Sequence, residues 1–166
     1  MPTFIAFLRA VNVGKRQYPM AELRQALTAA GFEEVATHIQ TGNALVRTRM
    51  RSRAKVTAAL EKAMLEDRGF AVPVVLFTPT ELVEAYDEAR AFGDEAAQRG
   101  DAIQGHYLTL LAEPTTAAAA RAIEARSEPG EELRAGRRAV HLLLTKPYRK
   151  SQLADMIRRA LHGGAA

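Results

Sequence analysis

The sequence predicts an α+β fold in a chain of 166 residues. Over residues 1–79 the expected elements run strand, helix, strand, strand, helix, strand, which is the split βαβ arrangement. Over residues 105–166 the order strand, helix, strand, strand, helix repeats most of that pattern. A linking helix and loop over residues 80–104 separate the two segments. These observations together predict an N-terminal ferredoxin-like subdomain followed by a related second subdomain.

The first strand and the first helix follow from local composition. Residues 3–8 form an apolar run, which is typical of a buried central strand. Pro19 suits the first turn of a helix, and apolar residues recur at helical spacing after Met20. Gly31 can end that helix, because glycine adopts the left-handed conformation without a steric penalty.

A hairpin and a second helix complete the first segment. Strands over 35–40 and 44–48 are predicted around Gly42-Asn43, a two-residue turn signal that places Val46 opposite Ile39. Ser52 is predicted to cap a helix that ends at Gly69. The strand over 72–77 contains a proline, which suits a sheet edge. The usual strand order of this fold, 4-1-3-2, places the fourth strand at an edge.

The second segment follows a helix that begins after a capping box. Thr78-Pro79-Thr80-Glu81 has the capping-box pattern and predicts an acidic helix over 80–90. The polar, glycine-containing residues 91–103 are the expected boundary. The remaining predictions are a strand over 106–112, a helix from Thr115 or Thr116 to Ala125, hairpin strands over 132–135 and 138–145, and a last helix capped by Ser151.

Composition excludes several classes of site. The chain has no cysteine, which excludes disulfides, thiol catalysis and cysteine-ligated zinc. The four histidines are scattered and match no metal-binding spacing, so we expect no metal and no cofactor. The carboxylates of the middle segment are expected to face solvent. No signal peptide or membrane-spanning stretch is evident, so a cytoplasmic location is expected.

Charge is unevenly distributed along the chain. The net charge is +4, with basic segments at both ends and an acidic middle. Such a pattern favours an anionic ligand or nucleic acid as partner, although basic residues on solvated faces would produce it as well. The sheet strands lack the paired aromatic residues of RNA-recognition domains, so nucleic-acid binding has weaker support.

Two stretches are predicted to form a ligand site. In the split βαβ arrangement, the loop after the first strand and the first hairpin lie at the same end of the sheet, beside the start of the first helix. A helix N-terminus with nearby cations and amides favours an anion or nucleotide. The predicted ligand-binding residues are Arg9, Asn12, Gly14, Lys15, Thr41, Gly42 and Asn43. The alternative is that these residues only form turns.

A basic loop before the last helix is a second candidate. Tyr148, Lys150 and Ser151 are predicted as contributors from the second subdomain, because an aromatic ring and cations can hold a base or a phosphate. The alternative is a solvated loop in which Ser151 caps the helix.

Several motifs resemble those of a bacterial family known as domain of unknown function 1697. The motifs are the segment Phe7–Gly14, Pro19–Arg24, Gly31-Phe32 and Ile39–Asn43, which are similar to that family's L-R-G-I-N-V-G, P-M-x-x-L-R, G-F and Q-S-G-N patterns. Ala10 and Thr41 depart from these patterns, and Ser151-Gln152-Leu153 stands where the family has S-K-L. The family's T-x-R-N-W-x-T segment does not follow, so a family site that used it would be incomplete. The resemblance implies the two-subdomain α+β fold and no particular activity.

Four functions remain open at this point. The leading hypothesis is a protein that binds a small anion or nucleotide at the loop and hairpin. An enzyme acting on a small phosphorylated substrate is the first alternative, although no general base is evident. A protein-interaction or dimerisation module and a non-specific nucleic-acid binder are the others, and the oligomeric state is left open.

Overall fold

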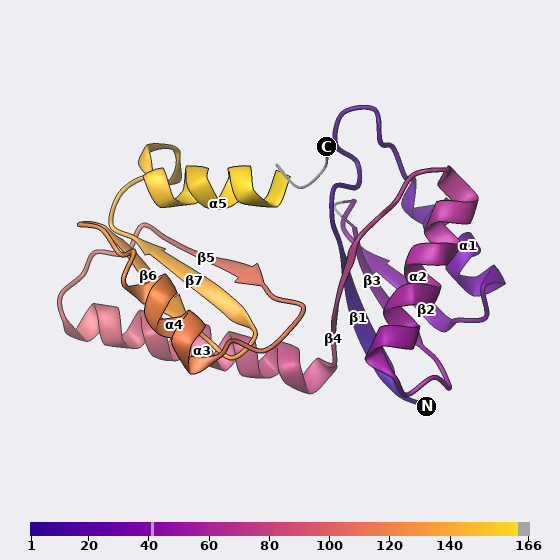
Figure 1. Cartoon of the computed structure of the whole chain (residues 1–166), viewed down its shortest axis with the longest axis horizontal. Coiled ribbons are helices and arrows are strands. Elements are labelled where there is room, and N and C mark those ends of the chain that lie inside the picture. The colour runs from indigo at the N-terminus through magenta and orange to yellow at the C-terminus, as the bar shows by residue number, and fades with distance from the viewer. Residues whose placement is uncertain (41, 163–166) are drawn as a thin grey trace. The chain divides into compact units, whose positions relative to one another are not determined.

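The chain forms two compact units, Met1–Thr80 and Glu81–Ala166. The structure is a computed structural model that describes residues 1–40 and 42–162. Figure 1 labels the elements of both units along the chain. Within the described residues, no helix is both long enough and apolar enough to span a membrane.

The first unit contains a four-stranded antiparallel sheet. Its strands are β1 (Thr3–Leu8), β2 (Glu33–His38), β3 (Asn43–Arg47) and β4 (Val74–Phe77). The strand order is β2-β3-β1-β4, which is the order expected from the sequence, with β4 at an edge. Pro73 directly precedes β4, so its missing N–H costs the sheet no hydrogen bond.

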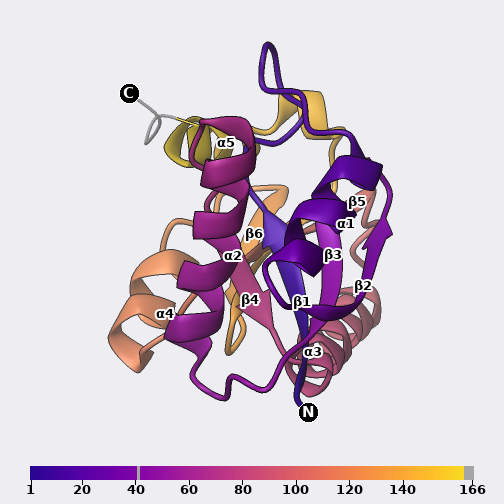
Figure 2. The same cartoon turned by 90° about the vertical axis from the view of Figure 1, so that its right-hand side faces the viewer.

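Two helices cover one face of this sheet. They are α1 (Met20–Ala29) and α2 (Arg53–Arg68), which lie in front of the strands in Figure 2. Alternate residues of β1 and one side of each helix are buried together, because each element is apolar on that side. The Ser52 hydroxyl accepts a hydrogen bond from the Lys55 N–H, and Gly69 ends α2 at φ 74°. Both predicted helix boundaries are therefore confirmed.

The predicted two-residue hairpin is wrong. Asn43 pairs with His38 inside the ladder, so β2 ends at His38 and Ile39 does not lie opposite Val46. The register shifts between Glu33 and Ala36, so that two residues of β2 oppose Val46. The pairs next to the connection, from His38–Asn43 to Ala36–Leu45, already differ from the register that a tight Gly-Asn turn would impose, and the bulge lies further along the strand.

The second unit contains a three-stranded antiparallel sheet. Its strands are β5 (Gly105–Leu110), β6 (Glu131–Ala135) and β7 (Ala139–Leu144), in the order β5-β7-β6. Helix α3 (Pro79–Gln98) lies along one face, and α4 (Ala117–Glu124) and α5 (Gln152–His162) lie on the other (Figure 1). A short 3-10 turn, η1 (Tyr148–Lys150), precedes α5. Thr116 and Ser151 cap α4 and α5, as expected.

Helix α3 differs from its prediction in length and in surroundings. It continues beyond residue 90 to Gln98, through the polar segment that was expected to be a boundary. Its carboxylates do not simply face solvent, because they bind arginines of the second sheet. Arg138 is 4% exposed and donates to Glu81 at 2.9 Å, while Arg134 donates to Glu95 at 2.8 Å. The Arg138 guanidinium is buried and therefore requires an anionic partner, whereas Arg134 is partly exposed.

Candidate functional site

The loop after β1 and the β2–β3 connection meet at one end of the first sheet. The Leu8 N–H donates to the Gly42 carbonyl at 2.8 Å. The Asn12 amide Nδ2 donates to the Gln40 carbonyl at 2.6 Å. The two stretches that the topology predicted to converge are therefore in direct contact. Thr41, a predicted ligand residue, lies outside the described residues.

The side chain of Asn12 braces this loop. Its Oδ1 accepts from the Tyr18 N–H at 2.7 Å, and its Nδ2 donates to the Tyr18 carbonyl at 3.2 Å as well as to Gln40. The amide has therefore used both of its N–H donors inside the protein. Asn12 holds the loop in place rather than offering those donors to a ligand.

Tyr18 anchors the far end of the loop in the core. It is completely buried, and the Arg68 guanidinium carbon lies 4.6 Å from the centre of its ring. Burial, with a further contribution from the Asp67 carboxylate, raises the pKa of Tyr18 to about 12. The phenol therefore stays protonated at physiological pH.

The backbone of this region adopts an unusual conformation. Four non-glycine residues of the described chain have a positive φ, and three of them lie here: Ala10 at 55°, Asn12 at 56° and Ile39 at 52°. Each such residue costs on the order of 1–3 kcal/mol, and such costs are found most often at functional sites. Gly14, at φ 59°, is a further left-handed residue of the loop after β1, and it does not carry this cost.

Two cations of the loop are exposed and unpaired. Arg9 and Lys15 have exposed side chains, and neither forms an ion pair or side-chain hydrogen bond with any described residue. The Arg16 guanidinium instead lies 5.8 Å from the centre of the Phe70 ring. Asn43 is half-buried in β3. Of the predicted site residues in this unit, Arg9 and Lys15 are thus the ones with free charge.

Gly42 is expected to be irreplaceable at this junction. Its φ is 93°, and an added Cβ would lie 3.0 Å from the Leu8 Cβ. We expect Gly42→Ala to lower the free energy of unfolding by about 1–3 kcal/mol, measured by urea denaturation. Gly93→Ala is the control, because a Cβ at that helical position meets nothing within 4 Å. It should stabilise the protein by about 0.5–1 kcal/mol, and equal losses in both variants would contradict the packing argument.

The predicted contributors from the second unit are in different situations. Tyr148 is half-exposed and its ring centre lies 4.5 Å from that of Tyr107, while Lys150 is exposed. Ser151 is buried, and its hydroxyl donates to Glu131 at 2.7 Å and accepts from the Ala154 N–H at 2.9 Å. Ser151 therefore acts as a helix cap, which is the alternative that the sequence had left open.

A buried histidine pair was missed by the sequence analysis. The His106 Nε2 and His141 Nδ1 atoms lie 3.1 Å apart, and His141 is completely buried against Phe92 of α3. Burial lowers the pKa of both residues, to about 4 for His141, where the neighbouring His106 and Arg134 also contribute. The pairing of β5 with β7 brings these two histidines together although they are 35 positions apart, and no sequence spacing predicts such a contact. Among residues 1–40 and 42–162, no group of three or more possible ligands is arranged for a metal ion.

Comparisons with known proteins agree with this α+β architecture. Residues 1–141 match the family model described as "Protein of unknown function (DUF1697)", so the chain belongs to that family. No curated protein matches the sequence. The conserved bacterial protein SP0830 from Streptococcus pneumoniae is similar in structure, with a TM-score of 0.64 and 21% identity over 97% of this chain and 98% of that chain. At that identity, the likeness supports the fold alone.

Proposed function

We propose that the protein binds a small anionic ligand, of the phosphate or nucleotide class, at the loop that follows β1. Arg9 and Lys15 supply the positive charge, and Asn12, Gly14 and Gly42 give the loop its shape. The strand order of the first sheet and its two helices on one face support a ferredoxin-like subdomain as the scaffold.

The proposal rests on one observation: strained backbone conformations lie beside the unpaired cations Arg9 and Lys15. Ala10, Asn12 and Ile39 hold left-handed backbone conformations where glycine would be less costly. The Asn12 amide fixes these conformations by joining the loop to the β2–β3 connection. A connection that only reverses the chain needs neither this bracing nor two exposed cations. A braced loop with free cations is a preorganised site for an anion.

The other predicted ligand residues have unequal support. Asn43 and Thr41 stay predictions as additional polar contacts, and Tyr148 and Lys150 as contributors from the second unit. Ser151 is the exception, because its hydroxyl is already committed to Glu131 and to the α5 backbone. The proposal therefore depends on Arg9 and Lys15.

A double variant tests this proposal directly. Thermal unfolding of the wild type is measured with inorganic phosphate, pyrophosphate and mononucleotides, at low and high salt. A ligand present at 100 times its Kd should stabilise the protein by about 2.7 kcal/mol. In Arg9→Ala/Lys15→Ala, we expect the shift to disappear while the ligand-free melting temperature changes little, because both side chains are exposed.

The matched control is Arg51→Ala/Lys55→Ala. It removes the same two charges from exposed positions near the start of α2, and it should keep the ligand-induced shift. If the control loses the shift as well, the ligand responds to overall charge rather than to the loop. If only DNA or RNA stabilises the wild type, and only at low salt, the site is not one for a small ligand and the proposal is rejected.

A further inference from the structure

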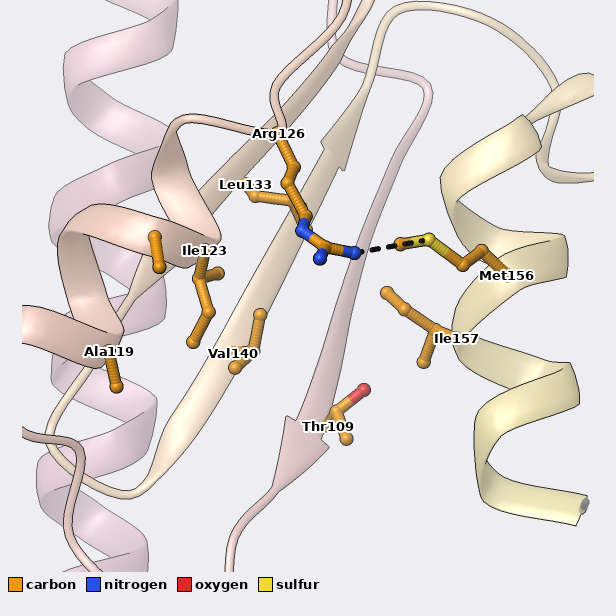
Figure 3. A pocket seen from close by; sticks show the side chains of 9 residues that line it. Thr109, Ala119, Ile123, Arg126, Leu133, Val140, Met156 and Ile157 are labelled. Carbon is orange, nitrogen blue, oxygen red and sulfur yellow. Dashed lines mark hydrogen bonds between the residues drawn. The ribbon is translucent and has the colours of Figure 1, made fainter.

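The second unit contains an apolar groove between α4 and α5. Its floor is formed by the sheet and its sides by the two helices, as Figure 3 shows. The volume is about 360 Å³, near the lower end of the range for small-molecule sites. Eight of the nine lining residues are apolar or contribute mainly carbon, among them Ala122, Ile123, Met156 and Ile157.

The ninth lining residue is a cation without an anionic partner. Arg126 follows α4 and extends across the groove towards α5 (Figure 3). Its Nη1 lies 3.7 Å from the Met156 sulfur, and thioether sulfur is a weak acceptor. No carboxylate within the described ranges pairs with Arg126. The guanidinium fork is therefore free to bind a planar anion in two-point fashion.

We propose that this groove binds a small amphiphilic carboxylate, with its apolar body on the sheet and its carboxylate on Arg126. Charge complementarity selects this occupant, because an anion can form charged hydrogen bonds with the exposed guanidinium and a neutral apolar molecule cannot. The small volume favours a short chain or a single ring over a polypeptide, since stable protein interfaces bury more than about 1,000 Å². This site lies wholly within the second unit and does not depend on the loop site.

Octanoate and 1-octanol are suitable probes, because they share an alkyl chain and differ in charge. Binding to the full chain is followed by NMR of labelled isoleucine and methionine methyl groups. Ile123, Met156 and Ile157 line the groove, whereas Ile5 and Ile39 belong to the first unit and serve as internal references. We expect octanoate to shift the groove signals and to bind more tightly than 1-octanol.

Two variants separate charge from shape. Arg126→Gln should weaken octanoate binding by about 5- to 10-fold and leave 1-octanol unchanged, which is the size expected for a charged hydrogen bond at a solvent-open site. Arg121→Gln is the matched control, because Arg121 is an exposed arginine of α4 that does not line the groove. Ala122→Phe should fill the groove and abolish binding of both probes.

The outcomes are decisive in both directions. A selective loss of octanoate affinity in Arg126→Gln, together with loss of both probes in Ala122→Phe, supports the proposal. Equal affinity of wild type for the two probes, or equal effects of Arg126→Gln and Arg121→Gln, overturns it. Absence of groove shifts with either probe overturns it too, and shifts that depend on protein concentration would identify a second copy of the chain as the occupant instead.

Discussion

Replacing Glu131 by alanine is expected to lower the free energy of unfolding by about 3–5 kcal/mol. The carboxylate is 2% exposed and accepts four hydrogen bonds at the start of α5. The donors are Lys146 Nζ at 2.9 Å, Ser151 Oγ at 2.7 Å, and the N–H groups of Gln152 at 3.1 Å and Leu153 at 2.8 Å. Alanine would leave these donors without their partner, and buried unpaired donors are costly.

The measurement is urea denaturation at pH 7, with two comparison variants. Glu128→Ala removes an exposed carboxylate from the preceding turn and should change stability by less than about 0.5 kcal/mol. Glu131→Gln keeps the shape and loses the charge, so it should fall between the wild type and Glu131→Ala. Equal stability of Glu128→Ala and Glu131→Ala would show that the four hydrogen bonds contribute little.

The lowered pKa of Glu131 makes its contribution to stability depend on pH. Burial alone would raise the pKa of this carboxyl, but the hydrogen bonds from Lys146, Leu153, Ser151 and Gln152 outweigh it and lower the pKa from 4.5 to about 2. The native protein thus binds fewer protons here than the unfolded chain does. The stabilisation is complete above about pH 4.5 and is lost as the pH falls towards 2.

The elements that the sequence predicted well are those with local causes. The apolar run of β1, helical spacing in α1 and α2, and the caps at Ser52 and Ser151 depend on neighbouring residues. Pro73 was correctly placed at an edge for a local reason as well, because proline lacks an N–H. From these elements alone, a known topology brought the β1 loop and the first hairpin together.

The elements that the sequence misjudged depend on distant contacts. Gly42-Asn43 has the local signature of a two-residue turn, yet Gly42 is held by Leu8 of β1 and Gln40 by Asn12. These bonds to residues outside the hairpin outweigh the local turn preference. The local pattern also predicted that Asn12 binds a ligand. The sequence does not distinguish an amide that is free for a ligand from one that forms hydrogen bonds within the protein.

The sequence analysis failed most often on buried polar residues. Glu131 was expected to lie just outside the strand at 132–135, and the carboxylates of α3 were expected to face solvent. Pattern analysis assigns polar residues to the surface by default, whereas Glu131, Arg138 and His141 are buried with partners far away in the chain. Arg126 was likewise treated as an ordinary surface residue, because its proposed ligand-binding role depends on the groove beside it.

Acidification from pH 7 to pH 5 is expected to cost the wild type up to about 2 kcal/mol of stability through His141. Burial, the neighbouring His106 and the Arg134 guanidinium lower the pKa of His141 from 6.5 to about 4. The unfolded chain therefore takes up a proton in this range while the native protein does not. Stability is complete above about pH 6.5 and falls as the pH approaches 4.

The surroundings of His141 set the upper limit of this effect. Helix α3 contributes Glu88, whose Oε2 lies 3.6 Å from the His141 Nε2, and strand β5 contributes His106. Glu88 favours the imidazolium and opposes the other groups, so about 2 kcal/mol is a maximum. The pH window lies above that of Glu131, so the two groups can be measured separately in one protein.

The experiment compares the pH dependence of unfolding in His141→Gln and His38→Gln. His38 has an exposed side chain, so His38→Gln should reproduce the wild-type slope between pH 7 and pH 5. His141→Gln should show a much shallower slope, whatever its stability at pH 7, because glutamine does not titrate. A residual slope is expected from His106, whose pKa is also lowered by burial. Identical slopes in the wild type and His141→Gln would mean that His141 takes up its proton over the same pH range in the native and unfolded chains, with Glu88 offsetting the effect of burial.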